Sequence, residues 1–283
     1  MVAVSVIIPT FNRAIKTVRA ISSVLYQRFT DHEIIVVDDG STDPTNEALR
    51  QFKDRIHIAV HTTNRGVSAA RNTGIAASTA PLVAFLDSDD YWLPEKLSVQ
   101  TAFFDENPHA MICQTEETWI RNGKRVNPRN RHLKPSGDVF EPSLELCLVS
   151  PSSVMLKRAL LEEVGLFDED LPACEDYDLW LRIACRYPVF LIRQSLVVKE
   201  GGHADQLSAR FPGMDRFRIM ALVKLLQESP LSESQQKTAL RELHRKCQIY
   251  GTGCLKRGKK AEGAHYLKLP STFEMLQDKK PCF

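Results

Sequence analysis

The sequence lacks the features typical of secreted proteins, of membrane-spanning proteins and of proteins held together by zinc ions or disulfides. It contains no stretch of about 18 consecutive apolar residues, so no membrane-spanning helix is expected. The N-terminus enters a strand-like run at once, without a basic segment or cleavage-like site, which argues against a secretory signal. The seven cysteines are dispersed and form no C-x-x-C pair, so neither a zinc site nor a disulfide framework is expected. We therefore expect a cytoplasmic protein, with peripheral contact on the inner face of a membrane left open.

Charge is balanced overall but unevenly distributed along the chain. The 283 residues carry a formal net charge of +2. From residue 216 onward, 14 Lys and Arg stand against six Asp and Glu, whereas the preceding residues carry a surplus of acidic side chains. This asymmetry predicts metal or cationic chemistry in the front part and an anionic partner for the tail, either an anionic membrane or a lipid diphosphate, and not nucleic acid. The alternative for the tail is a set of helices whose lysines are simply solvated.

Strand-like and helix-like patterns alternate through the first hundred residues. Strands are expected at residues 4–8, 33–37, 56–60 and 82–86, and helices at 14–26, 43–52 and 69–77. Because the strands are mostly apolar, this order predicts an α/β fold with a Rossmann-like, mostly parallel sheet flanked by helices. In such sheets ligands bind beyond the carboxyl ends of the strands, where the polar clusters 10–12, 38–39 and 87–89 fall.

Beyond Pro94 the pattern is less regular. We expect a helix over 95–106, a hairpin that turns at Asn122-Gly123, strands at 152–156 and 189–198, and a helix that opens near Cys174. The polar stretch 127–142 is expected to be a mobile loop. From residue 213 onward the pattern is helical and basic, so residues 1–212 are predicted to form one domain and residues 213–283 a helical C-terminal extension.

An acidic stretch, Asp87-Ser88-Asp89-Asp90, follows the apolar run 81–86. Three carboxylates at the end of a buried strand repel one another and lose hydration. A divalent cation with oxygen ligands relieves both costs, so the stretch predicts a metal site. The alternative is a solvated acidic turn in which Asp90 caps the next helix.

Five sequence blocks, taken in order, make the chain resemble the family 2 glycosyltransferases of the GT-A fold. The blocks are SVIIPTFN (5–12), IVVDDGSTD (35–43), NRGVSAARNTG (64–74), FLDSDDYWLP (85–94) and EDYDLWLR (175–182). The resemblance implies a nucleotide-sugar-binding half over 1–100 and an acceptor-binding half over 101–212. It also implies inverting transfer of a sugar from a nucleoside diphosphate sugar, with UDP preferred, to a hydroxyl of a glycan or lipid-linked acceptor. The basic tail is not explained by the resemblance.

The resemblance further implies which residues contact the donor. The matching positions are Pro9, Thr10, Asn12, Asp39, Arg71, Asp87 and Ser88. Asp39 would accept a hydrogen bond from the uracil ring N–H, unless it is an Asx-turn residue before Gly40. Arg71 would lie near the base or the diphosphate, with a salt bridge to Asp38 or Asp87 as the alternative.

A metal ion, Mn²⁺ or Mg²⁺, is implied on Asp89 of the D-x-D element. It would stabilise charge on the departing nucleoside diphosphate. Asp90 is a second candidate ligand. His203, in a loop that follows Gly201-Gly202, is a third, and the alternative is an ordinary polar loop residue.

Asp176 matches the catalytic base of the family. A base in this place takes a proton from the acceptor hydroxyl as its oxygen attacks the anomeric carbon. Glu175 and Trp180 are candidates for contact with the acceptor. The alternative for the acidic pair Glu175-Asp176 is a cap on the positive N-terminus of a helix.

Three other functions compete with this interpretation. A haloacid-dehalogenase-type phosphatase also uses strand-Asp-x-Asp chemistry, but it expects Thr or Val where this chain has Tyr91. A sugar-nucleotide pyrophosphorylase needs a Gly-rich basic loop after the first strand, where residues 9–13 stand instead. A nucleotide-sugar-binding protein without turnover would have no need of Asp176 in addition to Asp89.

Overall fold

The computed structural model describes residues 2–127, 130–202, 211 and 213–277. Its strands are β1 (Val4–Thr10), β2 (His32–Asp38), β3 (His57–Val60), β4 (Leu82–Phe85), β5 (Tyr91–Trp92), β6 (Ile112–Arg121), β7 (Lys124–Val126), β8 (Val154–Lys157) and β9 (Phe190–Gly201). Its α-helices are α1 (Ala14–Leu25), α2 (Thr45–Leu49), α3 (Val67–Ala77), α4 (Lys96–Glu106), α5 (Phe140–Glu145), α6 (Arg158–Val164), α7 (Glu175–Ala184), α9 (Asp215–Glu228), α10 (Glu233–Lys256) and α11 (Lys260–Gln277).

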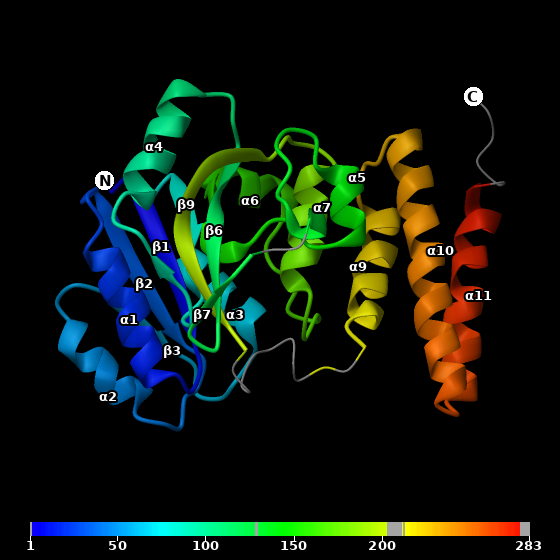
Figure 1. The fold of residues 1–283 in the computed structure, drawn as a ribbon, viewed down its shortest axis with the longest axis horizontal. Coiled ribbons are helices and arrows are strands. Elements are labelled where there is room, and N and C mark those ends of the chain that lie inside the picture. The colour runs from blue at the N-terminus through cyan, green and yellow to red at the C-terminus, as the bar shows by residue number, and fades with distance from the viewer. Residues whose placement is uncertain (1, 128–129, 203–210, 212, 278–283) are drawn as a thin grey trace.

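One mixed sheet runs through the protein in the order β3-β2-β1-β4-β8-β6-β9-β5, with β7 paired to β6. The strands β1 to β4 are parallel to one another. β8 runs antiparallel to β4 and β6, whereas β9 runs parallel to β6. Helices flank the sheet, and α10 and α11 lie side by side at the end of the molecule opposite α1 and α2 (Figure 1). The predicted α/β fold with flanking and C-terminal helices is confirmed.

Both faces of the first strands are buried, which explains their continuous apolar runs. Along β1, Val6 and Ile8 enter one core cluster together with α1, and Ile7 enters a second cluster together with α3, α6 and α7. The contact with α3 is close, since a Cβ added to Gly74 would lie 2.4 Å from Ile7 Cγ2. Because both faces are covered, the carboxyl-end edge of β1, β2 and β4 is the part of this sheet left to meet a ligand.

The stretch 127–142 differs from its expectation as a mobile loop. It contains a 3₁₀ turn, Asn130–His132, and the beginning of α5, where Phe140 is 3% exposed. Lys134 lies between these elements and donates hydrogen bonds to Thr115 O at 3.0 Å and Ser153 Oγ at 2.8 Å. A buried lysine anchors this segment against the sheet, a feature that its polar composition conceals.

The C-terminal extension packs on the sheet domain. Helix α9 contacts α7, and α10 contacts both α9 and α5. Helix α9 ends at Glu228, just before Ser229-Pro230, and α10 begins with a capping box between Ser232 and Gln235. In the part of the chain that the structure describes, no helix combines the length and apolar character needed to cross a bilayer.

Candidate active site

A cavity of about 460 Å³ opens where β1, β2 and β4 end. Its walls come from both halves of the chain, and eleven of the residues predicted for the site line it: Pro9, Thr10, Asn12, Asp39, Arg71, Asp87, Ser88, Asp89, Asp90, Glu175 and Asp176. The ends of parallel strands bring eight of them to one edge of the sheet, α3 supplies Arg71, and the N-terminus of α7 supplies Glu175 and Asp176. The structure thus brings together polar groups that lie far apart in the sequence.

Asp39 organises one wall of the cavity. Its carboxylate accepts hydrogen bonds from the backbone N–H groups of Arg65 and Gly66, both at 2.8 Å, and lies 2.7 Å from His61 Nδ1. These contacts fix the turn that leads into α3. An ionised carboxylate has about four acceptor positions, so three contacts leave one for a ring N–H of a bound base. The predicted contact with the donor is compatible with this structural task.

Asn12 holds the loop after β1 against the loop after β2. Its backbone adopts the left-handed conformation, with φ of 52°, which asparagine tolerates better than most residues. Its side-chain oxygen accepts hydrogen bonds from the backbone N–H groups of Thr42 at 2.7 Å and Asp43 at 3.2 Å. Asn12 therefore fixes the positions of two loops that border the cavity, and it also lines the cavity itself.

Arg71 joins the two halves of the site. From α3 it reaches Asp87 Oδ1 and Glu175 Oε1, each at 2.7 Å, and its side chain is 3% exposed. Burial alone would raise the pKa of Asp87, but Arg71 and Lys199 outweigh it and hold that pKa below its usual range. Burial and the neighbouring Asp176 raise the pKa of Glu175 in spite of its ion pair with Arg71. The salt bridge considered as the alternative for Arg71 is therefore present, with Asp87.

The other two carboxylates of the acidic stretch have separate partners. Asp89 Oδ2 pairs with Arg13 Nη1 at 2.9 Å. Asp90 is 3% exposed and accepts hydrogen bonds from Ser152 Oγ at 2.6 Å and from the Glu200 N–H at 3.1 Å. Burial raises the pKa of Asp90 well above its ordinary value, and the nearby charge of Asp89 acts in the same direction against the cation Lys199.

The carboxylates of the acidic stretch can hold a metal ion only if a bound molecule supplies further oxygen atoms to the same ion. Among the described residues, no group of three or more His, Cys, Asp or Glu side chains is arranged to hold an ion by itself. Asp87 and Asp89 face the cavity with side chains 27% and 14% exposed, so they can offer oxygen ligands to an ion that also binds phosphate oxygens. His203, the third predicted ligand, lies outside the described residues.

Asp176 lines the same cavity as the acidic stretch. It belongs to the first turn of α7, which is preceded by Cys174 in the left-handed conformation with φ of 63°. The Cys147 thiol lies 3.3 Å from Val149 O and 3.5 Å from Asp176 Oδ2, so its single S–H can donate to either oxygen. Burial and the adjacent carboxylate of Asp176 raise the pKa of Cys147 well above its ordinary value and keep it protonated. Asp176 is half-buried, so its carboxylate is accessible to a molecule in the cavity.

Trp180 does not line the cavity. It is 2% exposed and packs edge-on against Phe167, with ring centroids 6.2 Å apart. Trp180 lies one turn beyond Asp176 on the same side of α7, but its turn is buried in the core whereas the first turn of α7 borders the cavity. The structure places it in the core and away from the predicted acceptor contact.

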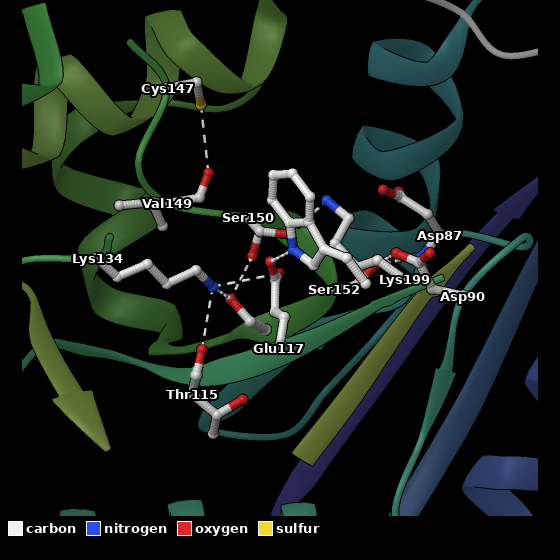
Figure 2. Close-up of polar contacts among 12 residues, drawn as sticks. Asp87, Asp90, Thr115, Glu117, Lys134, Cys147, Val149, Ser150, Ser152 and Lys199 are labelled. Atoms are coloured by element: carbon white, nitrogen blue, oxygen red, sulfur yellow. Dashed lines mark hydrogen bonds and ion pairs between the residues drawn. The ribbon is translucent and has the colours of Figure 1, made fainter. Parts of the chain in front are cut away.

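Sequence reasoning missed a polar network behind the acidic stretch. Figure 2 shows Lys199 beside Asp87 and Asp90, with Glu117 and Lys134 further back. Lys199 lines the cavity, and its ammonium donates to Ser150 Oγ at 3.0 Å. The only sequence signal was a charged residue near the end of an apolar strand, a position where a side chain emerges at the ligand edge of the sheet.

Three comparisons with known proteins place this chain among enzymes. Residues 5–165 match the model of glycosyl transferase family 2. An uncharacterized glycosyltransferase of Rickettsia bellii is 37% identical over 65% of this chain, which spans only 26% of that protein. The Escherichia coli protein WfgD, named a UDP-Glc:α-D-GlcNAc-diphosphoundecaprenol β-1,3-glucosyltransferase, is 33% identical over 64% of this chain and 69% of its own length.

Solved structures agree in fold. Residues 1–349 of S. aureus TarS, in complex with UDP-GlcNAc, superpose with a TM-score of 0.74 at 22% identity, over 95% of this chain and 79% of that one. The mannosyltransferase PcManGT of Pyrobaculum calidifontis, in complex with GDP-Man and Mn²⁺, gives a TM-score of 0.64 at 19% identity, over 98% and 88% of the two chains. With a family model that matches more than half of its length and a sheet of GT-A architecture, the chain belongs to the family 2 glycosyltransferases.

Proposed function

We propose that this protein transfers a sugar from a UDP-sugar to a hydroxyl group with inversion, and that Asp176 is the base. The observation that carries the proposal is that Asp176 and the acidic stretch 87–90 line the same cavity, and that Arg71 joins Asp87 to Glu175, the neighbour of Asp176. A donor bound along the sheet edge would present its anomeric carbon within this cavity. Two relatives support the donor class, since WfgD is named for UDP-Glc and the TarS complex holds UDP-GlcNAc.

The chemistry is a single displacement. The acceptor oxygen forms a bond to the anomeric carbon while its proton passes to the Asp176 carboxylate. The bond between the anomeric carbon and the diphosphate oxygen breaks, and its electron pair leaves with the nucleoside diphosphate. The Cys147 thiol helps to orient the Asp176 carboxylate whenever it donates to Asp176 Oδ2 and not to Val149 O. Glu175 is held by Arg71 on the adjacent wall, so it positions the first turn of α7 without needing to accept the proton.

Mn²⁺ or Mg²⁺ is the cofactor that suits this site. Asp89, with Asp87 as its neighbour, would hold the ion, and the ion would stabilise negative charge on the diphosphate. PcManGT, a structural neighbour, is described with Mn²⁺. Calorimetry should show tighter binding of UDP with Mn²⁺ than with EDTA, and Asp89→Asn should lose that difference. Equal UDP affinity in both conditions would remove the metal from the proposal.

Asp176→Asn tests the base directly. The amide keeps the shape of the side chain but cannot take a proton, so transfer should drop at least about 10²-fold while UDP affinity stays close to that of the wild type. Asp54→Asn is a matched control, because Asp54 is an exposed carboxylate outside the cavity. An Asp176→Asn enzyme with normal turnover would place the base elsewhere. A wild-type protein that binds UDP and never transfers, across a panel of donors and acceptors, would favour the binding-protein alternative.

A lipid-linked acceptor on an anionic membrane is the second part of the proposal. Helix α10 exposes Lys237 and Arg241 one turn apart, with Lys256 further along, and Ile249 on the same helix is 52% exposed. Basic side chains near an anionic surface each contribute about 1 kcal/mol of attraction. The printed name of WfgD includes a diphosphoundecaprenol acceptor, which is consistent with such a location.

Charge reversal tests the membrane contact better than deletion of the tail. Helices α9 and α10 bury Leu222 and Leu243 in the same core cluster as α7, so removing them would expose the core. Replacing Lys237, Arg241 and Lys256 with Glu should abolish co-sedimentation with vesicles that contain about a third phosphatidylglycerol. The same reversal at Lys53, Lys124 and Arg125, which are exposed on the front part, is the control. Equal sedimentation of the two triple variants would refute the contact.

A further inference from the structure

One cation of the cavity differs from the others in having no carboxylate partner of its own. Arg13 pairs with Asp89 at 2.9 Å, and Arg71 is shared between two carboxylates at 2.7 Å. Arg218, at the far wall, pairs with Asp215 at 3.0 Å. Among the described residues, the hydrogen-bond partner of the Lys199 ammonium is the neutral Ser150 Oγ. An ammonium carries three donors, so two of those on Lys199 are left for a ligand.

The surroundings of Lys199 keep it charged and aimed at the cavity. Burial alone would lower the pKa of Lys199, but the carboxylates of Glu117, Asp90, Asp87 and Asp176 raise it well above its usual range. Three of these carboxylates have other partners: Glu117 pairs with Lys134 at 3.2 Å, Asp87 with Arg71, and Asp90 with Ser152. Lys199 is therefore a permanent positive charge between the acidic stretch and Asp176. Figure 2 shows how its side chain runs alongside Asp87 and Asp90.

A nucleoside diphosphate bound in this cavity needs a positive charge such as that of Lys199. The cavity walls carry the carboxylates of the acidic stretch, Glu175, Asp176 and Glu200, which repel a diphosphate. One divalent ion balances only part of this negative charge, and the arginines are already engaged in ion pairs. A cation that lines the same cavity as the acidic stretch and Asp176 can also offset the charge that develops on the leaving group.

We propose that Lys199 binds the diphosphate of the donor and stabilises the negative charge on the departing nucleoside diphosphate. This inference rests on the proposed glycosyl transfer, because that reaction supplies the diphosphate. Ser150 and Glu117 are positioning residues. Ser150 Oγ accepts a hydrogen bond from the Lys199 ammonium, and the nearby Glu117 carboxylate attracts its charge. The role requires a charged donor, so arginine should replace Lys199 in part and methionine should not.

The test compares inorganic pyrophosphate, UDP and uridine as ligands of three variants. Lys199→Met should weaken binding of pyrophosphate and UDP about tenfold to hundredfold, as expected for a lost hydrogen bond between charged groups, and leave uridine affinity unchanged. Lys199→Arg should recover most of the UDP affinity. Arg193→Met removes an exposed cation from the same strand and should change none of these affinities.

The outcomes separate this inference from the proposed function. If Lys199→Met binds pyrophosphate and UDP like the wild type, or loses uridine affinity equally, Lys199 does not bind the diphosphate even though the transferase function stands. A wild type that binds no pyrophosphate and no nucleoside diphosphate also overturns the role of Lys199. If pyrophosphate binding depends on Lys199 while uridine does not bind at all, Lys199 keeps its role and the uridine part of the proposed donor is wrong.

Discussion

Lys134→Met should destabilise the fold although Lys134 lies outside the cavity. The Lys134 side chain is 8% exposed, and its ammonium pairs with Glu117 Oε1 at 3.2 Å, where the Glu117 side chain is 3% exposed. It also donates to Thr115 O at 3.0 Å and Ser153 Oγ at 2.8 Å. Methionine fills a similar volume but donates nothing, so the Glu117 carboxylate stays buried without its nearest cation. Removing one partner of a buried pair costs about 3–5 kcal/mol of unfolding free energy.

Urea unfolding followed by circular dichroism measures this loss. The control is Lys124→Met, because Lys124 is exposed on β7, and a surface substitution there should stay within about 0.5 kcal/mol. In the double variant Lys134→Met/Glu117→Gln the buried charge is gone, so the combined loss should be smaller than the sum of the single losses by at least about 0.5 kcal/mol. A loss below about 1 kcal/mol for Lys134→Met, or strictly additive losses, would refute a buried pair that supports the site.

The ion pair between Lys134 and Glu117 also makes the free energy of unfolding depend on pH. Burial alone would raise the pKa of Glu117, but Lys134 and Lys199 outweigh it and lower that pKa from 4.5 to about 2. The carboxylate therefore contributes its full stabilisation above about pH 4.5, and this contribution disappears as the pH falls to about 2. A shift of this size corresponds to about 3 kcal/mol. Glu117→Gln should unfold with a visibly shallower dependence on pH across this window, and an unchanged dependence would contradict the assignment.

Three further substitutions test other parts of the fold and site. Gly74→Ala should cost about 1–3 kcal/mol in urea unfolding, because its Cβ would lie 2.4 Å from Ile7 Cγ2; an unchanged midpoint would mean that α3 can shift. Ser232→Ala should remove the capping box of α10 and lower stability by about 1 kcal/mol, with Ser234→Ala as the exposed control. Cys147→Ala should lower the turnover rate by at most about tenfold without changing UDP affinity, since it removes a thiol that donates to Asp176 or to Val149 O. Loss of UDP binding in that variant would give Cys147 a different role.

The first half of the fold could be predicted because its information is local. Apolar β-branched runs mark β1 and β2, and the polar residues that end them fall at the ligand edge of a parallel sheet. The two-residue strand β5 was missed, since it exists only through pairing with β9 far along the chain. Lys134 reads as a solvated loop residue, because its partners on β6 and in the turn before β8 are invisible in its neighbourhood. Trp180 follows the acidic pair in the sequence, yet the turn of α7 that carries it is buried in the core, away from the cavity.

The three carboxylates of the acidic stretch are equivalent in the sequence and become distinct through their partners. Asp90 uses one oxygen for Ser152 and the other for the backbone of β9, so it fastens the turn to two other elements. Asp87 is fixed by Arg71, which also carries Glu175, and moving it would disturb the link between the two halves of the site. Asp89 pairs with Arg13 on the loop after β1, at the rim of the cavity. Asp90 therefore holds the turn in place, whereas Asp89 faces the cavity and stays our predicted oxygen ligand for the metal.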